Sequence, residues 1–175
     1  MIAIPLHPLT RENFAPFGEL LTLDDAEHFP INSGTTERYH ALSKVDVTDQ
    51  GGQPIISLFR GQAFHLPFQL RVMERHPLGS QTFIPVNAQP GSRYLVVVAA
   101  PCPANEPAIG AGMRAFIARG FEGVTYGKGV WHHPLISLDR DADFIVVDRQ
   151  GSGNNCDEIT LGAQYVVSSQ TMEMA

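Results

Sequence analysis

The chain has 175 residues, and its 12 Lys and Arg against 18 Asp and Glu give a formal net charge of −6. This length fits a single domain spanning residues 1–175, large enough to bury a core without disulfide or metal staples. The acidic balance and the scattered basic residues argue against a nucleic-acid-binding protein, which presents a basic face. The two cysteines, Cys102 and Cys156, are far apart and form neither a disulfide framework nor a cysteine-based zinc site.

The sequence carries no signal for export or for insertion into a membrane. The first residues lack the basic region and following apolar region of a secretory signal peptide. The longest apolar run, Leu95 to Ala100, is far shorter than the ~20 residues that cross a bilayer. Together with the isolated cysteines, these features predict a cytoplasmic protein, in a reducing compartment and without a membrane partner.

In chain order, the predicted elements are short strands divided by frequent turn residues. The 16 glycines and 13 prolines are spread along the chain and separate segments rich in Val, Ile, Phe and Leu. Strands are expected at residues 18–22, 55–60, 68–75, 81–86, 94–100, 123–126, 131–138, 144–148 and 164–167. This number of short strands with irregular turns predicts an all-β fold, a double-sheet jelly roll.

Two short helices are predicted beside the strands. At residues 10–14, Thr10 is a candidate N-cap, and an acidic residue follows in the first turn. At residues 112–118, Met113, Phe116 and Ile117 have the i, i+3 and i+4 spacing of one helical face. The expected fold is therefore a jelly roll with one or two short helices.

Candidate metal ligands are concentrated in one stretch, Glu74-Arg75-His76 followed by Gln81. Side chains two apart on a strand point to the same face, so Glu74 and His76 are expected to share a cavity while Arg75 faces away. Residues 77–80 indicate a turn, and a hairpin would then bring Gln81 back beside the other two. The Glu-x-His pair is also compatible with a hydrogen-bonded pair on a partly solvated edge, and Gln81 alone with a surface position.

His132 is the fourth candidate ligand and comes much later in the chain. The neighbouring rings of His132 and His133 must face opposite sides of a strand, and the spacing favours His132 for the cavity. Imidazole suits nickel, zinc, copper and iron, while carboxylate and amide oxygens complete a set for a divalent cation. Four such ligands leave residual positive charge and open coordination positions, which favours a small anionic substrate.

These motifs resemble those of the cupin superfamily. The first cupin motif is His-x-His-x4-Glu, and Glu74, His76 and Gln81 occupy its frame here. The second is Gly-x-x-His, matched by Gly129 to His132. The whole chain is similar to one branch in particular, the ureidoglycolate lyase family of allantoin degradation. The segments that carry this similarity are residues 8–18, 31–40, 57–60, 74–85 and 127–135.

The resemblance implies a cupin-type double-stranded β-helix, a homodimer, and cleavage of ureidoglycolate to glyoxylate and urea, stimulated by Ni²⁺. A divalent ion held by Glu74, His76, Gln81 and His132 would acidify the substrate hydroxyl. Of these ligands, Glu74, His76 and His132 are candidate catalytic residues as well. Two alternatives stay open. One is an amidohydrolase that releases ammonia and carbon dioxide from the same substrate, and the other is a non-catalytic cupin that binds a small carboxylate.

Several further side chains are candidates for roles beside the metal. Lys128, a candidate catalytic residue, and Tyr126, a candidate for substrate binding, come shortly before the last candidate ligand and could approach the cavity mouth. Most lysines, however, are simply solvated. Arg38 and His40 are candidates for binding the substrate from a loop, and such a loop can equally pack on a partner subunit. Trp131 is expected in core or interface packing.

Overall fold

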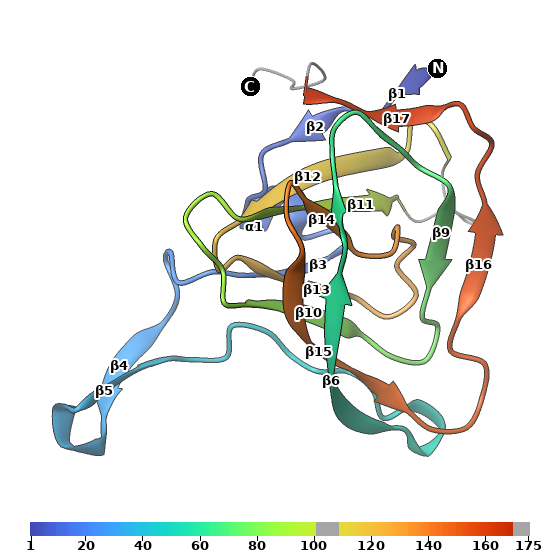
Figure 1. The fold of residues 1–175 in the computed structure, drawn as a ribbon. Helices are drawn as coiled ribbons and strands as arrows, with labels where there is room; N and C mark the ends of the chain where they lie inside the picture. Colours follow the sequence, from blue (N-terminus) through green and yellow to red (C-terminus); the bar gives the residue numbers. More distant parts are fainter. Residues whose placement is uncertain (101–108, 170–175) are drawn as a thin grey trace.

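A computed structural model describes residues 1–100 and 109–169 of the chain, and two five-stranded sheets form its body (Figure 1). The first, called here the β10 sheet, has the strand order β3 (Gly18–Leu21), β13 (Gly123–Tyr126), β10 (Gln81–Val86), β15 (Ala142–Gln150) and β6 (Gln53–Gly61). The second, the β11 sheet, has the order β2 (Leu6–His7), β12 (Met113–Arg119), β11 (Arg93–Ala99), β14 (Ile136–Leu138) and β7 (Ala63–Phe64).

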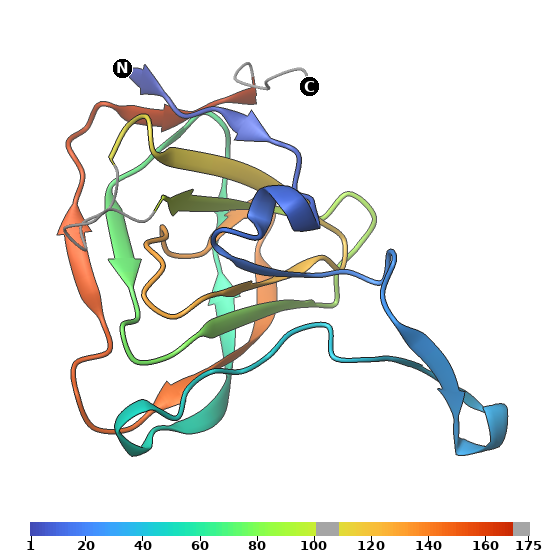
Figure 2. The ribbon, with the colours of Figure 1, turned by 180° about the vertical axis from the view of Figure 1, so that it is seen from behind.

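Smaller groups of strands surround this body. One is the three-stranded group β1 (Ile2–Ala3), β17 (Tyr165–Val167) and β8 (Phe68–Gln69), and another pairs β16 (Asp157–Thr160) with β9 (Val72–Arg75). A third pairs β4 (His28–Ile31) with β5 (Thr36–Tyr39) in a ribbon that stands away from the body in both views (Figures 1 and 2). Two short 3-10 turns lie at η1 (Asn32–Gly34) and η2 (Asp49–Gly51).

The prediction of an all-β, jelly-roll fold is confirmed. From β10 onward the chain crosses between the two sheets at β10–β11, at β12–β13, at β13–β14 and at β14–β15. Among the described residues, α1 (Arg11–Phe14) is the only α-helix, and Thr10 is its N-cap as predicted, with its side chain accepting from the N–H of Asn13. No helix in the described part is long or apolar enough to cross a membrane.

The core has two layers because the β11 sheet is buried on both faces. Its inner face packs on the β10 sheet, with Val96 and Phe116 against Phe83 and Phe144. Its outer face packs under the smaller strand groups, in a second cluster. The buried members of that second cluster are Ile4, Leu6, Leu70, Met73, Leu95, Val97, Ala99, Met113, Ala115, Trp131, Ile136, Leu138, Leu161, Tyr165 and Val167.

The predicted helix at residues 112–118 is wrong, because this segment is strand β12. It pairs along its length with β11 on one side and with β2 on the other. Met113 and Ala115 belong to the outer core cluster, and Phe116 and Ala118 to the inner one. A strand buried on both faces loses the apolar–polar alternation of period two, so the i, i+3, i+4 spacing arose without a helix.

The predicted hairpin between Glu74 and Gln81 is also wrong. β9 pairs with β16, while β10 lies in the β10 sheet between β13 and β15. The turn at residues 77–80 therefore carries the chain from one sheet to the other. Gly79 lets this turn pack closely, since a Cβ there would lie 2.7 Å from Cβ of Arg149.

Most other predicted strands match within a residue or two, with two exceptions. The segment 68–75 is broken into β8 and β9, and of 131–138 only Ile136–Leu138 is a strand, preceded by isolated bridges at His132. Cys102 lies outside the described residues, and Cys156 is exposed.

Candidate metal centre

The backbone holds Glu74 and His132 directly opposite each other. The N–H of each donates to the C=O of the other, over 2.7 Å and 2.8 Å. His132 also forms a bridge with Val98 of β11, so it joins β9 to the β11 sheet. Opposite residues of an antiparallel pair project their side chains to the same face. Val98 belongs to the core between the two sheets, so Glu74 and His132 face that space as well.

Three predicted ligands come together there. Oε1 of Glu74 lies 3.5 Å from Nε2 of His132 and 4.0 Å from Nε2 of His76. All three ligand atoms lie within 4.8 Å of one another. Ligands ~2.1 Å from one ion lie about 3 to 4 Å apart, so a small adjustment of the side chains would let one cation contact all three. Glu74 and His76 share a face, as their spacing predicts.

Backbone carbonyls hold both imidazoles in the tautomer that a metal needs. Nδ1 of His76 lies 2.7 Å from the O atom of Asn155, and Nδ1 of His132 lies 2.9 Å from that of Val130. A carbonyl oxygen only accepts, so in the neutral ring Nδ1 carries the hydrogen and Nε2 keeps its lone pair. Within residues 1–100 and 109–169, both Nε2 atoms are buried without a hydrogen-bond partner. Since buried polar atoms are normally paired, this arrangement fits a metal ion.

Gln81 reaches the same space from the β10 sheet. Its side chain is buried, and its Oε1 has no hydrogen-bond partner in the described part of the chain. Gln81 is paired with Tyr126 on one side. On the other side, the pair Thr82–Val147 places Gln81 opposite Asp148 one step further along. A cavity of about 330 Å³ lies beside these strands, lined by His76, Ser80, Gln81, Asp148, Arg149, Asn154, Asn155 and Cys156.

Burial and neighbouring charges act against each other on the two carboxyl groups of the site. Burial raises the pKa of Glu74, but contact with His132 and the charge of His76 outweigh it, and the net pKa is lowered. Burial also raises the pKa of Asp148, and contact with Gln81 and the charge of His76 only partly oppose it, so that pKa is raised. The centre therefore contains two acids held in different environments.

Tyr126 forms a wall of the centre. Its ring stacks on that of His132, with centroids 4.0 Å apart and planes 13° from parallel. Burial, together with the charge of Glu74, raises the pKa of Tyr126, so its phenol stays neutral at ordinary pH. The stacking holds the His132 ring in place.

A second group of ligand atoms shares Glu74 with the first. It adds Cys156 and Glu158, and Glu158 is the direct cross-strand partner of Glu74. Both added residues are exposed, and exposed acidic groups are common in proteins without a metal. The first group holds two buried, unpartnered Nε2 atoms and the second holds none, so we place the candidate centre at Glu74, His76 and His132, with Gln81 beside them.

Arg75 and Trp131 lie where the strand pattern predicts. Nε of Arg75 donates to Asp157 over 2.9 Å, and its guanidinium lies 4.9 Å from the centre of the Trp131 ring. Trp131 is buried in the outer core cluster. Neither belongs to the group of ligand atoms around Glu74.

Lys128 is drawn toward two acids of a neighbouring loop. Its Nζ lies 2.9 Å from Asp49 and 3.2 Å from Asp46, and these contacts raise the pKa of the lysine. Arg38 and His40 lie at and just beyond the end of β5, in the ribbon that stands away from the body (Figure 1). Both contact Phe29 of β4, Arg38 at 5.9 Å and His40 at 5.7 Å from the ring centre.

Two residues of the site, Asp148 and Asn155, are not among the candidates predicted from the sequence. Asp148 could have been found, because Phe144, Val146 and Asp148 alternate along a predicted strand and so share its inward face. Asn155 holds His76 through its C=O, and its side-chain oxygen accepts from the N–H of Leu78 over 2.8 Å. It lies in a loop where no periodicity applies.

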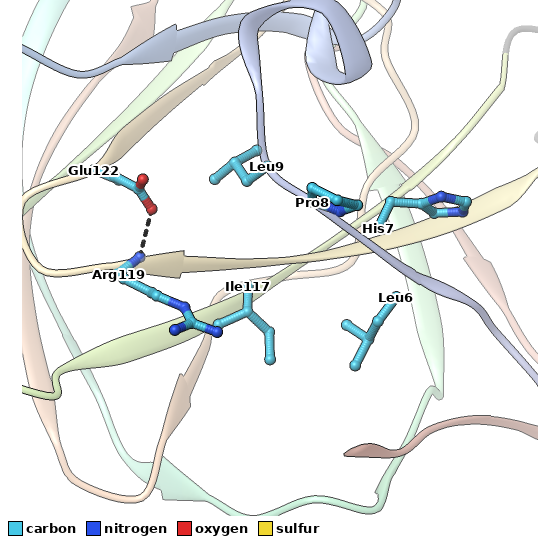
Figure 3. Close-up of a pocket in the computed structure, with 7 residues that line it drawn as sticks. All are labelled: Leu6, His7, Pro8, Leu9, Ile117, Arg119 and Glu122. Carbon is cyan, nitrogen blue, oxygen red and sulfur yellow. Dashed lines mark hydrogen bonds between the residues drawn. The ribbon is translucent and has the colours of Figure 1, made fainter. Parts of the chain in front are cut away.

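A separate hollow lies at the edge of the β11 sheet, beside β2 and β12 (Figure 3). It has a volume of about 290 Å³, and its lining residues are Leu6, His7, Pro8, Leu9, Ile117, Arg119 and Glu122. Its carboxylate, Glu122, accepts a hydrogen bond from the backbone N–H of Arg119 over 2.7 Å. The groups of metal-ligating side chains in the described residues both contain Glu74, so this hollow is not part of the candidate centre.

The fold and the site together define a jelly-roll protein with a candidate centre of two histidines, a glutamate and a glutamine. The family model described as Ureidoglycolate lyase matches residues 1–168. A protein named ureidoglycolate lyase from Burkholderia cepacia is 56% identical over 159 residues, covering 91% of this chain and 86% of its own. Another of that name from Pseudomonas entomophila (strain L48) is 46% identical over 158 residues, covering 90% and 91%. The chain belongs to the ureidoglycolate lyase family.

Two solved structures are similar at low identity. A dTDP sugar isomerase from Desulfovibrio desulfuricans G20 has a TM-score of 0.47 at 12% identity, covering 91% of this chain and 92% of its own. A dTDP-6-deoxy-D-glucose-3,5-epimerase from Legionella pneumophila Philadelphia 1 has a TM-score of 0.40, also at 12% identity, covering 84% and 82%.

Proposed function

We propose that this chain is a ureidoglycolate lyase, which cleaves ureidoglycolate to glyoxylate and urea in the breakdown of purine nitrogen. Its family and the names of its relatives support the reaction. The observation that carries the proposal is the meeting of Glu74, His76 and His132, with two buried Nε2 atoms that have no partner among the described residues. Atoms with a free lone pair suit a bound cation, and that cation would in turn attract an anionic substrate.

We assign the metal to Glu74, His76, Gln81 and His132, and we expect it to be Ni²⁺. Imidazole nitrogen is a ligand that nickel favours, and the remaining donors are oxygens. When bound, the ion supplies a Lewis acid that polarises the oxygens it contacts. The set lacks thiolates and has only two imidazoles, so we expect the metal to be lost easily in purification.

The protein side chains then have separate tasks. The reaction requires the substrate hydroxyl to lose its proton, the carbon–nitrogen bond to break, and the departing urea nitrogen to gain a proton. Glu74 is the anionic member of the centre, and we assign to it the acceptance of the hydroxyl proton. His76 and His132 are held by backbone carbonyls, so they keep their orientation through the reaction. Tyr126 would confine the substrate on the side of His132.

The ribbon of β4 and β5 gives a reason to expect a homodimer. Isolated two-stranded ribbons are marginal in water, and this one exposes Phe29 and Tyr39. The outer face of the β10 sheet is also apolar, with Ile56 75% and Leu58 57% exposed. A second copy would cover both surfaces. Within such a dimer we assign Arg38 and His40 to the substrate carboxylate in the centre of the partner subunit.

Light scattering after size-exclusion chromatography tests this assembly. We expect twice the mass of one chain, and the replacement Leu58→Asp should shift the mass toward that of a single chain. A wild-type protein that stays monomeric at micromolar concentration would contradict the dimer.

We further propose that residues 1–175 act as one domain in the cytoplasm, in keeping with the scarcity of cysteine in the sequence.

A product assay tests the reaction. Purified protein is incubated with ureidoglycolate, with and without added Ni²⁺, and urea, ammonia and glyoxylate are measured together. We expect urea and glyoxylate in equal amounts, and their loss in the variant Glu74→Ala. Ammonia with carbon dioxide in place of urea would identify an amidohydrolase. Tight binding without turnover would identify a carboxylate-binding protein.

A further inference from the structure

Asp148 lies beside Gln81 and is accounted for by neither the motif nor the assigned ligands. It lies on the inward face of β15, the face on which Phe144 and Val146 are buried between the sheets. Its carboxyl lines the cavity that His76 and Gln81 also line. Oδ1 of Asp148 is buried and has no partner within the described residues. A carboxyl group in this position needs a reason to be there, because burying it is costly.

The chemistry of Gln81 supplies that reason. An amide has two ends of nearly equal shape, an NH₂ group that donates and an oxygen that accepts, and only the oxygen binds a metal cation. Neighbours must therefore decide which end faces the centre. Gln81 stands between Tyr126 and Asp148 in the β10 sheet. An Asp148 carboxylate can only accept, so it selects the NH₂ end and turns Oε1 away from itself.

The observed state of the two ends agrees with this selection. Gln81 and Asp148 lie opposite each other on β10 and β15, and the contact with Gln81 partly offsets the rise in the pKa of Asp148 that burial causes. Oε1 of Gln81 is left buried and without a partner among residues 1–100 and 109–169, as are the Nε2 atoms of His76 and His132. One backbone carbonyl orients each imidazole, and the carboxylate of Asp148 is placed to do the same for the amide. Partners of this outer kind typically contribute about 10- to 100-fold to metal affinity.

We infer that Asp148 is a positioning residue, which holds the amide of Gln81 with its oxygen toward the metal centre. The inference rests on the proposed function, because it assumes that a cation binds there. It adds a fifth side chain to the centre, one that acts through Gln81 without touching the ion. It also explains how a neutral amide, a weak ligand, can serve where a carboxylate is usual in the related motif.

A double-mutant cycle on metal binding separates positioning from simple charge. The dissociation constant for Ni²⁺ is measured by calorimetry for wild type, Asp148→Asn, Gln81→Ala and the double variant. The amide introduced by Asp148→Asn could both donate and accept, so the amide of Gln81 would lose its fixed orientation. We expect Asp148→Asn to weaken binding about tenfold or more in the wild-type background, and less than about twofold in the Gln81→Ala background.

The controls keep the result unambiguous. Asp143→Asn makes the same replacement on the same strand, at a carboxylate paired with Arg60 over 2.8 Å on the surface, and should leave the dissociation constant unchanged. The visible spectrum of bound Co²⁺ should change in Asp148→Asn and remain unchanged in Asp143→Asn. If Asp148→Asn yields too little folded protein, Asp148→Ser takes its place in the cycle.

Each outcome decides the matter. An equal loss of affinity in both backgrounds would mean that Asp148 acts through charge alone, and would overturn the inference while leaving the metal centre intact. Unchanged affinity in Asp148→Asn would overturn it in the same way. If wild type binds no Ni²⁺, the proposed centre fails first and the role of Asp148 fails with it.

Discussion

Glu74 and His132 are 58 positions apart in the sequence (132 minus 74) and exchange two backbone hydrogen bonds, of 2.7 and 2.8 Å. Their side chains meet on the same face, with Oε1 3.5 Å from Nε2. The backbone pairing sets the side-chain distance, so the candidate centre depends on one antiparallel bridge between β9 and the segment before β14. Loss of either partner should disturb the centre more than it disturbs the fold.

The two adjacent histidines offer a matched test of that dependence. We expect His132→Gln to weaken Ni²⁺ binding and to lower kcat/KM, each by ~100-fold or more, because one ligand of the centre is removed. His133→Gln should retain both properties, because the His133 ring faces the other way and packs edge-on against Phe68 at 5.5 Å. Thermal unfolding with and without Ni²⁺ gives the same comparison, since only a protein that binds the ion gains stability from it. Equal losses in the two variants would contradict the assignment of His132.

Arg75 should contribute to stability and not to the reaction. Its ion pair with Asp157, at 2.9 Å, is partly buried and lies on the side of β9 away from the centre. Replacement of Arg75 by Ala should lower the free energy of unfolding by about 1 kcal/mol and leave kcat/KM within a few-fold of wild type. Urea denaturation and steady-state kinetics on the same preparation measure both. A large specific loss of turnover in a stable protein would mean that the face assignment of β9 is in error.

For Lys128, the sequence and the observed ion pairs suggest different roles. The sequence suggests a catalytic role, whereas the side chain contacts Asp46 and Asp49. Because the ammonium is already paired with these two carboxylates, we expect Lys128→Met to change kcat/KM by no more than about threefold, and the loss of exposed ion pairs should cost little stability. Steady-state kinetics at saturating Ni²⁺ measures this. A fall of two orders of magnitude would instead support the catalytic role.

Asp139 should make stability depend on pH in the acid range. Its hydrogen bond from Arg93, at 2.6 Å, holds the pKa of the carboxyl below its usual value. A carboxyl whose pKa is lower in the folded state stabilises the protein above its unfolded-state pKa, and this contribution is lost as the pH falls through the folded-state pKa. Asp139→Asn should therefore be less stable than wild type at pH 7, and the difference should shrink toward zero below about pH 4. Unfolding temperatures measured from pH 7 to pH 3 follow the effect, and a difference independent of pH would contradict it.

Local pattern predicts a large part of this fold and site. Glu74 and His76 share a face because side chains alternate along a strand with a period of two. This prediction does not depend on the partner strand, which is β16 and not β10. Thr10 was recognisable as a cap from residue type alone. Phe144, Val146 and Asp148 alternate on a predicted strand, so Asp148 too was within reach of the same argument.

The features that the sequence does not predict depend on contacts between elements that are far apart in the chain. Residues 113–119 form a strand with both faces buried, and the reason is the outer layer, to which β9 and β17 contribute from far away in the sequence. The periodicity of residues 113–119 cannot reveal that a distant part of the chain buries their outer face. Likewise, Asn155 orients His76 from a loop, and only the folded chain brings the two together.

The donor set of the bound metal is the most direct test of the central claim. An X-ray absorption spectrum at the nickel edge, recorded on protein reconstituted with one equivalent of Ni²⁺, reports the neighbouring atoms. We predict scattering from two imidazole rings together with oxygen ligands, and the loss of one imidazole in His132→Gln. A shell of sulfur would place the ion at Cys156 and Glu158, and the absence of imidazole would contradict the centre formed by Glu74, His76, Gln81 and His132.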